Sequence, residues 1–219
     1  SHVALGNRRL AVLDLSPRGH QPMMSHDRRF VMTYNGEVYN YLELKSDLER
    51  SFETGTDTEV VLEAFARWGP ESFNRLNGMF ACAIWDRLTE RLLLVRDRFG
   101  VKPLYYAELD GTLYFASEIK SLAAAGVPLE PDQDTWFAYL RYGAYDHSSA
   151  TFFKGIRRVP PGHYLSWKDG RIELHRWYDL PERVKTDWPD ERSDSVVSEE
   201  YHQLLQDSVR IRFRSDVPV

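Results

Sequence analysis

The sequence predicts an α+β fold, and three kinds of observation support this prediction. Short apolar segments rich in aromatic and β-branched residues alternate with turn residues, as strands do. Asp-Gly pairs between such segments, as at Asp110–Gly111, are typical of tight hairpins. Two other segments carry apolar residues at three- and four-residue spacing, which indicates helices. Strands are expected at Leu10–Leu15, Arg29–Tyr34, Met79–Trp85, Arg91–Arg96, Leu104–Leu109 and Thr112–Ala116.

Two helices interrupt these strands, and the second has well-defined ends. The first is expected over Tyr41–Phe52, where apolar residues recur on one face. Thr56 and Glu59 form a capping box at the start of the second, and a Gly-Pro pair ends it. Asp57 therefore lies in the first helical turn, where the helix dipole favours a carboxylate. Stabilisation of the helix alone would explain this residue.

The rest of the chain consists of a further folded segment and then a segment of different composition. A third helix is expected at Asp134–Arg141, and Asp169–Gly170 indicates a second hairpin. Residues 182–198 are charged and aperiodic, which indicates a linker. Because one helix cannot bury its apolar face alone, residues 199–219 are expected to begin a second domain. Three arginines of this segment are expected on the solvated face of its helix: Arg210, Arg212 and Arg214.

Composition argues against several classes of function. The 219 residues include 28 Lys and Arg against 33 Asp and Glu, a net charge of −5, which disfavours nucleic acids and acidic membranes as partners. The longest aliphatic run, Leu92–Val95, is far shorter than the roughly 20 residues that span a bilayer. The single cysteine, Cys82, permits no intramolecular disulfide, which suits the cytoplasm. The histidines lack metal-ligand spacing, so no metal site is expected.

A few residues are candidates for catalysis or ligand binding, and each of them could instead have a purely structural role. Asn35 and Gly36 follow an apolar segment, and they fit either a hairpin turn or two donors of an oxyanion hole. Arg9 fits either a solvated charge or a guanidinium that holds a carboxylate. Cys82 lies among apolar residues, which raise the pKa of a thiol and block access to it, so it is expected in the core.

Several ordered motifs together resemble one family, the glutamine-hydrolysing asparagine synthetases. The segment 207–219, which ends in SDVPV, is similar to the stretch just before the ATP-binding loop of that family. The resemblance covers nearly the whole chain. Its other motifs are NRRLAVLDLS (7–16), GHQPM (19–23), YNGEVYNY (34–41), TGTDTE (54–59), LNGMFACAIWD (76–86), RDRFGVKPLYY (96–106), FASEIKSL (115–122) and VPPGHY (159–164).

The resemblance implies a class II glutamine amidotransferase domain with the N-terminal nucleophile hydrolase fold. That fold is a four-layer αββα sandwich of two mainly antiparallel sheets. Residues 1–181 would form this domain without its N-terminal segment, 182–198 the linker, and 199–219 the start of an α/β ATP-pyrophosphatase domain. In such enzymes a cysteine at the mature N-terminus attacks glutamine and frees ammonia. The ammonia then amidates aspartate that ATP has activated.

The resemblance also assigns roles to individual residues. Arg9 matches the arginine that holds the α-carboxylate of glutamine, and Asn35 and Gly36 match the oxyanion donors. Glu37 and Asp57 match the groups around the α-ammonium, which makes Asp57 a ligand-facing residue rather than only a helix stabiliser. The remaining residues expected to contact glutamine are Leu10, Val12 and Leu13.

The sequence departs from the family pattern in two ways that bear on its activity. The nucleophilic cysteine would precede Ser1, and the ATP and Mg²⁺ sites would follow Val219. Ser1 itself is an alternative nucleophile, but the resemblance places it inside the domain, so we expect no glutaminase turnover from this chain. One hypothesis is that the chain is an internal fragment of an asparagine synthetase, or of a relative that amidates another carboxylate. Its partners would be small molecules, and a homodimer is possible. The other is a truncated, non-catalytic paralogue that binds glutamine or a protein.

Overall fold

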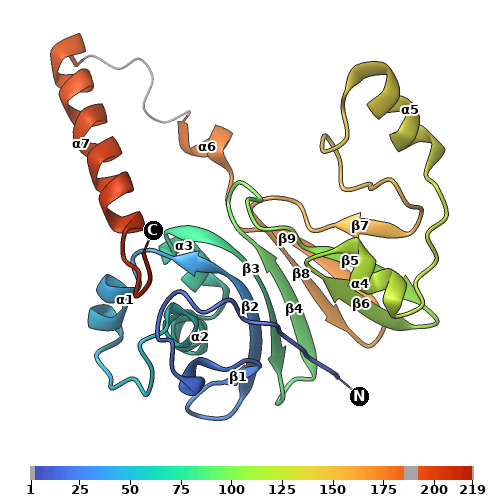
Figure 1. Cartoon of the computed structure of the whole chain (residues 1–219), viewed down its shortest axis with the longest axis horizontal. Coiled ribbons are helices and arrows are strands. Elements are labelled where there is room, and N and C mark those ends of the chain that lie inside the picture. The colour runs from blue at the N-terminus through green and yellow to red at the C-terminus, as the bar shows by residue number, and fades with distance from the viewer. Residues whose placement is uncertain (1–2, 185–191, 219) are drawn as a thin grey trace.

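Two antiparallel sheets form the centre of the computed structural model, which describes residues 3–184 and 192–218 (Figure 1). The larger sheet has the strand order β1-β2-β3-β4-β8-β9. It comprises β1 (Met23–Met24), β2 (Phe30–Val38), β3 (Gly78–Asp86), β4 (Arg91–Arg96), β8 (His163–Lys168) and β9 (Arg171–Arg176). The smaller sheet has the order β6-β5-β7 and comprises β5 (Tyr105–Leu109), β6 (Thr112–Ala116) and β7 (Ile156–Arg158).

The sheets pack face to face through alternate residues of their strands. Ala81 and Ala83 of β3 point to the same side of the large sheet as Leu94 of β4, because side chains alternate along a strand. Leu104 and Val159, next to β5 and β7, are buried in the same cluster. This apolar layer joins the two sheets.

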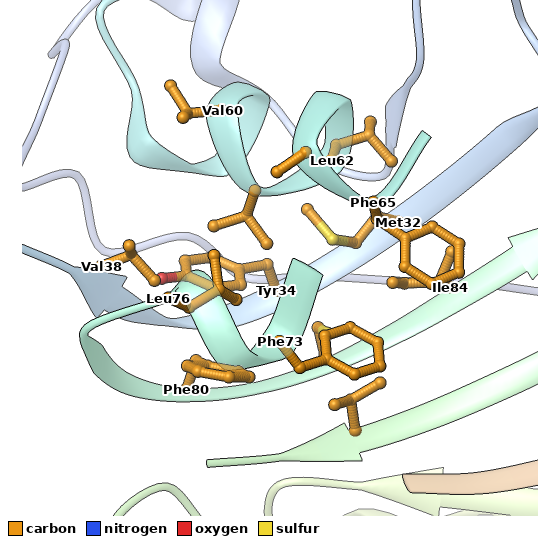
Figure 2. Close-up of a cluster of buried hydrophobic side chains, with 14 of the residues drawn as sticks. Met32, Tyr34, Val38, Val60, Leu62, Phe65, Phe73, Leu76, Phe80 and Ile84 are labelled. Carbon is orange, nitrogen blue, oxygen red and sulfur yellow. The ribbon is translucent and has the colours of Figure 1, made fainter. Parts of the chain in front are cut away.

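Helices cover the outer face of each sheet and complete four layers. The large sheet is covered by α1 (Tyr41–Leu48), α2 (Asp57–Trp68) and α3 (Ser72–Arg75). Figure 2 shows side chains of these helices, such as Phe65 and Phe73, gathered over residues of β2 and β3. The small sheet is covered by α4 (Ile119–Ala124), whose Leu122 is buried with Ala107 and Ile156. The αββα sandwich expected from the resemblance is therefore confirmed.

The other helical elements lie outside these layers. They are the short η1 (Pro17–Gly19) and η2 (Gly69–Glu71), then α5 (Gln133–Tyr142), α6 (Leu180–Val184) and α7 (Asp194–Arg212). Figure 1 shows α7 standing away from both sheets, with its last turn beside α1. Within the described ranges, none of the helices combines the length and apolar character that a membrane span needs.

Most of the predicted elements are confirmed. The hairpins at Asp110–Gly111 and Asp169–Gly170 join β5 to β6 and β8 to β9. At the start of α2, the Thr56 hydroxyl accepts a hydrogen bond from the Glu59 N–H at 3.3 Å. The carboxylate of Glu59 reaches further back than a capping box requires, and it accepts a 2.7 Å bond from the Thr54 N–H.

The strand predicted at Leu10–Leu15 is wrong, because this segment is an irregular loop. Asp14 has a φ of 51°, which breaks an extended conformation. The guanidinium of Arg9 donates to the carbonyl oxygens of Leu13 and Asp14, and these bonds curl the backbone around it. Three of the apolar residues that suggested a strand, Leu10, Val12 and Leu13, instead line a cavity.

The predicted linker at 182–198 differs from the structure at both of its ends. The helix α6 extends to Val184, and α7 begins at Asp194, while residues 185–191 lie outside the described part of the chain. Ser193 precedes α7 with extended backbone, and Asp194 places a carboxylate in its first turn. These are favourable helix-start residues, and the charged composition that suggested a linker suits an exposed helix equally well.

Two glycines allow β2 and β3 to approach each other closely. A Cβ built on Gly36 would lie 2.3 Å from the Met79 carbonyl oxygen, and one on Gly78 would lie 2.2 Å from the Glu37 carbonyl oxygen. Both contacts are with backbone atoms that cannot move without breaking the ladder. The close pairing of these strands therefore requires glycine at both positions.

We expect Gly78→Ala to lower the free energy of unfolding by about 1–3 kcal/mol, because the added methyl group forces the strands apart. Urea denaturation of both proteins would measure this difference. Gly6→Ala is the control, since a Cβ at Gly6 would meet no atom within 4 Å. Equal stability of Gly78→Ala and the wild type would contradict this account of the strand pairing.

Candidate functional site

A cavity of about 660 Å³ lies at the edge of the β2–β3 pair, between the two sheets. It is lined by the loop at residues 6–13, by β2, and by residues from 102–104 and 115–121. The eight residues expected to contact glutamine all line it: Arg9, Leu10, Val12, Leu13, Asn35, Gly36, Glu37 and Asp57. Their convergence is a finding of the structure, whereas their individual roles stay predictions.

The strand β2 presents Asn35 and Glu37 to this cavity. The interpretation of Asn35–Gly36 as a hairpin turn is wrong, because both residues lie inside β2 and pair with Ala81 and Phe80 of β3. Neighbouring side chains alternate, so Tyr34 and Val38 enter the core beneath α2 while Asn35 faces the other side. The strand continues through this Asn-Gly pair because the absent Cβ lets the two backbones approach.

The side-chain amide of Asn35 is held by a residue from the end of β6. Its Nδ2 donates a hydrogen bond of 3.1 Å to the hydroxyl of Ser117, a residue 82 positions away in sequence. This bond fixes the rotamer of an amide that the resemblance assigns to the oxyanion hole. Ser117 was not identified from the sequence, although it lies in the FASEIKSL motif.

Arg9 lines the same cavity, and backbone oxygens surround its guanidinium. It donates to the carbonyl oxygens of Leu13, Asp14 (2.7 Å) and Ser16 (3.4 Å). Gly19 packs directly against the guanidinium, since a Cβ there would lie 2.7 Å from its atoms. The expected strand position of Arg9 is thus replaced by a loop that forms around the side chain.

The other apolar residues of this loop differ in exposure. The side chain of Leu13 is buried, with 5% exposed, whereas Leu10 is 87% exposed and lies at the rim of the cavity. Asn7 ties the start of the loop to β2 by donating to the Tyr34 carbonyl oxygen at 3.2 Å. The loop is therefore attached to the strand that carries Asn35.

Asp57 links the helix α2, the core and the cavity. Its carboxylate is buried, with 6% of the residue exposed, and it accepts bonds of 2.8 Å from the Tyr34 hydroxyl and the Val38 N–H. Burial raises the pKa of Asp57, and these hydrogen bonds oppose that effect. Its place in the first turn of α2 also agrees with a helix-stabilising role, so the two interpretations are compatible.

Glu37 is half-buried, and its pKa is also raised. Desolvation is the main cause, and the nearby charge of Asp57 adds to it. Lys102 and Arg212 act in the opposite direction. Lys102 lines the cavity as well, although it was not identified from the sequence. A cavity with two carboxyl groups of raised pKa favours a cationic group, which would relieve their repulsion.

Cys82 is a core residue, as expected. Only 2% of it is exposed, and burial raises the pKa of its thiol to about 12, so it is not an activated nucleophile. The alternative nucleophile, Ser1, lies outside the described residues. Among the residues that the structure does describe, no group of three or more His, Cys, Asp or Glu could hold a metal ion.

The four-layer fold that carries this cavity is shared with a known glutamine amidotransferase. A solved structure of glutamine phosphoribosylpyrophosphate amidotransferase from B. subtilis, complexed with ADP and GMP, has the same fold. It matches with a TM-score of 0.54 and 23% sequence identity, over 72% of this chain and 32% of that chain.

Residues 1–178 match the family model described as "Glutamine amidotransferase domain", and the chain belongs to this family. Asparagine synthetase [glutamine-hydrolyzing] 1 of Bacillus subtilis is 35% identical over 100% of this chain and 34% of its own length. Amidase chry2 of Gibberella zeae is 38% identical over 100% of this chain and 32% of its own length. The chain thus spans about a third of these curated relatives.

The raised pKa of Glu37 predicts a pH-dependent effect of Glu37→Gln on stability. The folded state holds the Glu37 proton more tightly than the unfolded state does, where the pKa is about 4.3. The free energy of unfolding therefore falls as pH rises through the raised pKa. We expect the variant to gain stability relative to the wild type between pH 4 and pH 7, by up to about 1 kcal/mol because the group is partly exposed.

Urea denaturation at several pH values would measure this gain. Glu108→Gln is the matched control, because it removes a carboxylate from an exposed position on β5. A Glu37→Gln protein whose stability follows that of the wild type at every pH would refute the expectation.

Proposed function

We propose that the cavity binds L-glutamine and that this domain supports hydrolysis of its side-chain amide. The observation that carries the proposal is the convergence of opposite charges in one cavity, which Arg9, Glu37 and Asp57 all line. An α-amino acid presents a carboxylate and an ammonium group that match these two kinds of charge. Several relatives at 34–37% identity are named as glutamine-hydrolysing enzymes.

In this proposal each charged group has a role in binding. The guanidinium of Arg9 would bind the α-carboxylate through the N–H groups that do not already donate to the loop carbonyls. The α-ammonium would lie near Glu37 and Asp57 and lower their raised pKa values, so that binding stabilises their charged forms. The side chain of glutamine would then extend toward Asn35 and Gly36.

For the reaction, we propose that the Asn35 amide and the Gly36 N–H stabilise the negative oxygen of a tetrahedral intermediate. Addition of water to glutamine yields glutamate and ammonia. The nucleophile would be a thiol outside this sequence, because Cys82 is buried with a pKa of about 12. In a thioester mechanism this thiol attacks the amide carbon, ammonia leaves, and water releases glutamate.

The fate of the ammonia is a further part of the proposal. Relatives named asparagine synthetases favour aspartate as the acceptor of the ammonia. ATP and Mg²⁺ would then be bound by residues beyond this sequence. The single thiol suits the cytoplasm as the compartment. Other relatives, at 37–38% identity, are named amidases rather than asparagine synthetases, so amidation of another carboxylate is kept as the second candidate. The cavity described above would serve both in the same way.

Isothermal titration of this chain with L-glutamine tests the proposal. We expect binding by the wild type and an affinity roughly 10- to 150-fold lower for Arg9→Ala, because a charge-assisted hydrogen bond contributes about 1.5–3 kcal/mol. Glu37→Gln should also weaken binding, since it removes a negative charge from the ammonium subsite. Affinity should rise between pH 4 and pH 7 as these carboxyl groups ionise.

Arg67→Ala provides the control, because it removes a positive charge from an exposed position of α2 away from the cavity. Absence of binding by the wild type would reject glutamine binding by this domain. Equal affinities for the wild type, Arg9→Ala and Glu37→Gln would instead reject the assigned subsites.

A further inference from the structure

The chain after α7 returns to the domain and contacts the β2–α1 connection. Arg214 donates hydrogen bonds of 2.6 Å to both carboxylate oxygens of Glu43 and one of 2.6 Å to the Tyr39 carbonyl oxygen. Its side chain is 18% exposed, so the expectation of a solvated arginine is wrong at this position. Arg212 lies over the ring of Tyr39, 4.7 Å from its centroid. Tyr39 follows the cavity strand β2 directly.

Two residues further on, Asp216 contacts the loop that forms the other cavity wall. Its N–H donates to the Val12 carbonyl oxygen at 3.0 Å, and its carboxylate accepts a 2.7 Å bond from the Asp14 N–H. These two bonds enclose Leu13. The bond between Asp14 and Asp216 joins residues 202 positions apart in sequence, so this is a tertiary contact rather than a local turn.

The bonds from Asp216 and from Arg9 act on the same short piece of backbone. Arg9 donates hydrogen bonds to the carbonyl oxygens of Leu13 and Asp14. Asp216 donates to the Val12 carbonyl oxygen and accepts from the Asp14 N–H. Asp14 has a φ of 51°, a conformation that is uncommon for a non-glycine residue and that these bonds help to hold. The position of this wall therefore depends on the residues that follow α7.

We propose that residues 214–216 form a clasp that positions the wall loop, residues 12–14, and thereby controls glutamine affinity. This inference rests on the proposed function. Asp216 is a positioning residue, because it acts on the wall through the loop backbone. In the helix α7 the buried residue is Ile211, which lies in the last turn. The helix is therefore attached to the rest of the domain through this turn and through the clasp. A displacement of α7 would then loosen the cavity wall.

Hydrogen exchange and glutamine titration of the whole chain test the clasp. In Asp216→Ala, we expect the Asp14 amide to exchange roughly tenfold faster or more, because its charged acceptor is lost. Glutamine affinity should fall several-fold. Asp216→Asn keeps an acceptor oxygen at the same place and should restore most of both quantities. By reciprocity, glutamine should slow exchange of the Asp216 amide in the wild type.

Glu199→Ala is the matched control, because it removes an acidic side chain from the exposed part of α7, where it accepts a hydrogen bond from Gln203. If Asp216→Ala does not fold, Glu43→Gln loosens the clasp at its other anchor and should shift both readouts in the same direction. Unchanged exchange at Asp14 would overturn the clasp. Faster exchange with unaltered glutamine affinity would overturn its control of the cavity. If the wild type binds no glutamine, the proposed function fails, and exchange at Asp14 alone decides whether the clasp holds the loop.

Discussion

The close approach of β2 and β3 at Gly36 and Gly78 is the constraint on which the rest of the site depends. It keeps β2 extended through an Asn-Gly pair that would form a turn in isolation, and the register then runs without interruption from Phe30 to Val38. Because side chains alternate along this strand, one residue of slip would exchange its core face and its cavity face. The pairing therefore determines at once that Tyr34 packs beneath α2 and that Asn35 faces the space between the sheets.

Asp57 shows how the same constraint accommodates a buried charge. Isolated burial of a carboxylate is strongly unfavourable, and its raised pKa reflects that cost. Bonds from the Tyr34 hydroxyl and the Val38 N–H, both supplied by β2, offset part of it. The strand that carries the cavity residues thus also holds the helix-borne acid in place. A cation in the cavity would complete the compensation, which is why this acid and Glu37 suit the ammonium end of an amino acid.

Much of the fold could be predicted because its signals are local. Apolar alternation, the hairpin at Asp110–Gly111 and the cap at Thr56 act within a few residues, and these elements were predicted correctly. The loop around Arg9 could not be predicted in this way, because its shape depends on distant partners such as Asp216 and Gly55, which bond to Asp14. For the same reason Ser117 was missed: its role arises only when β6 is brought beside β2. The composition of residues 193–198 suits both a linker and an exposed helix, so the start of α7 was misplaced.

The two halves of the cavity are consequently supported in different ways. The half with Asn35 and Gly36 belongs to a sheet in which every neighbouring strand restrains it, so its geometry is coupled to the stability of the whole domain. The half with Arg9 belongs to an irregular loop, and a few hydrogen bonds to side chains and to the segment after α7 determine its position. Loops of this kind open locally at much lower free energy than sheet cores do. A change in the surroundings of α7 would therefore move Arg9 while Asn35 and Gly36 stay in place. Under the proposed function, substrate affinity and the chemistry at the amide would then be separable properties of one cavity.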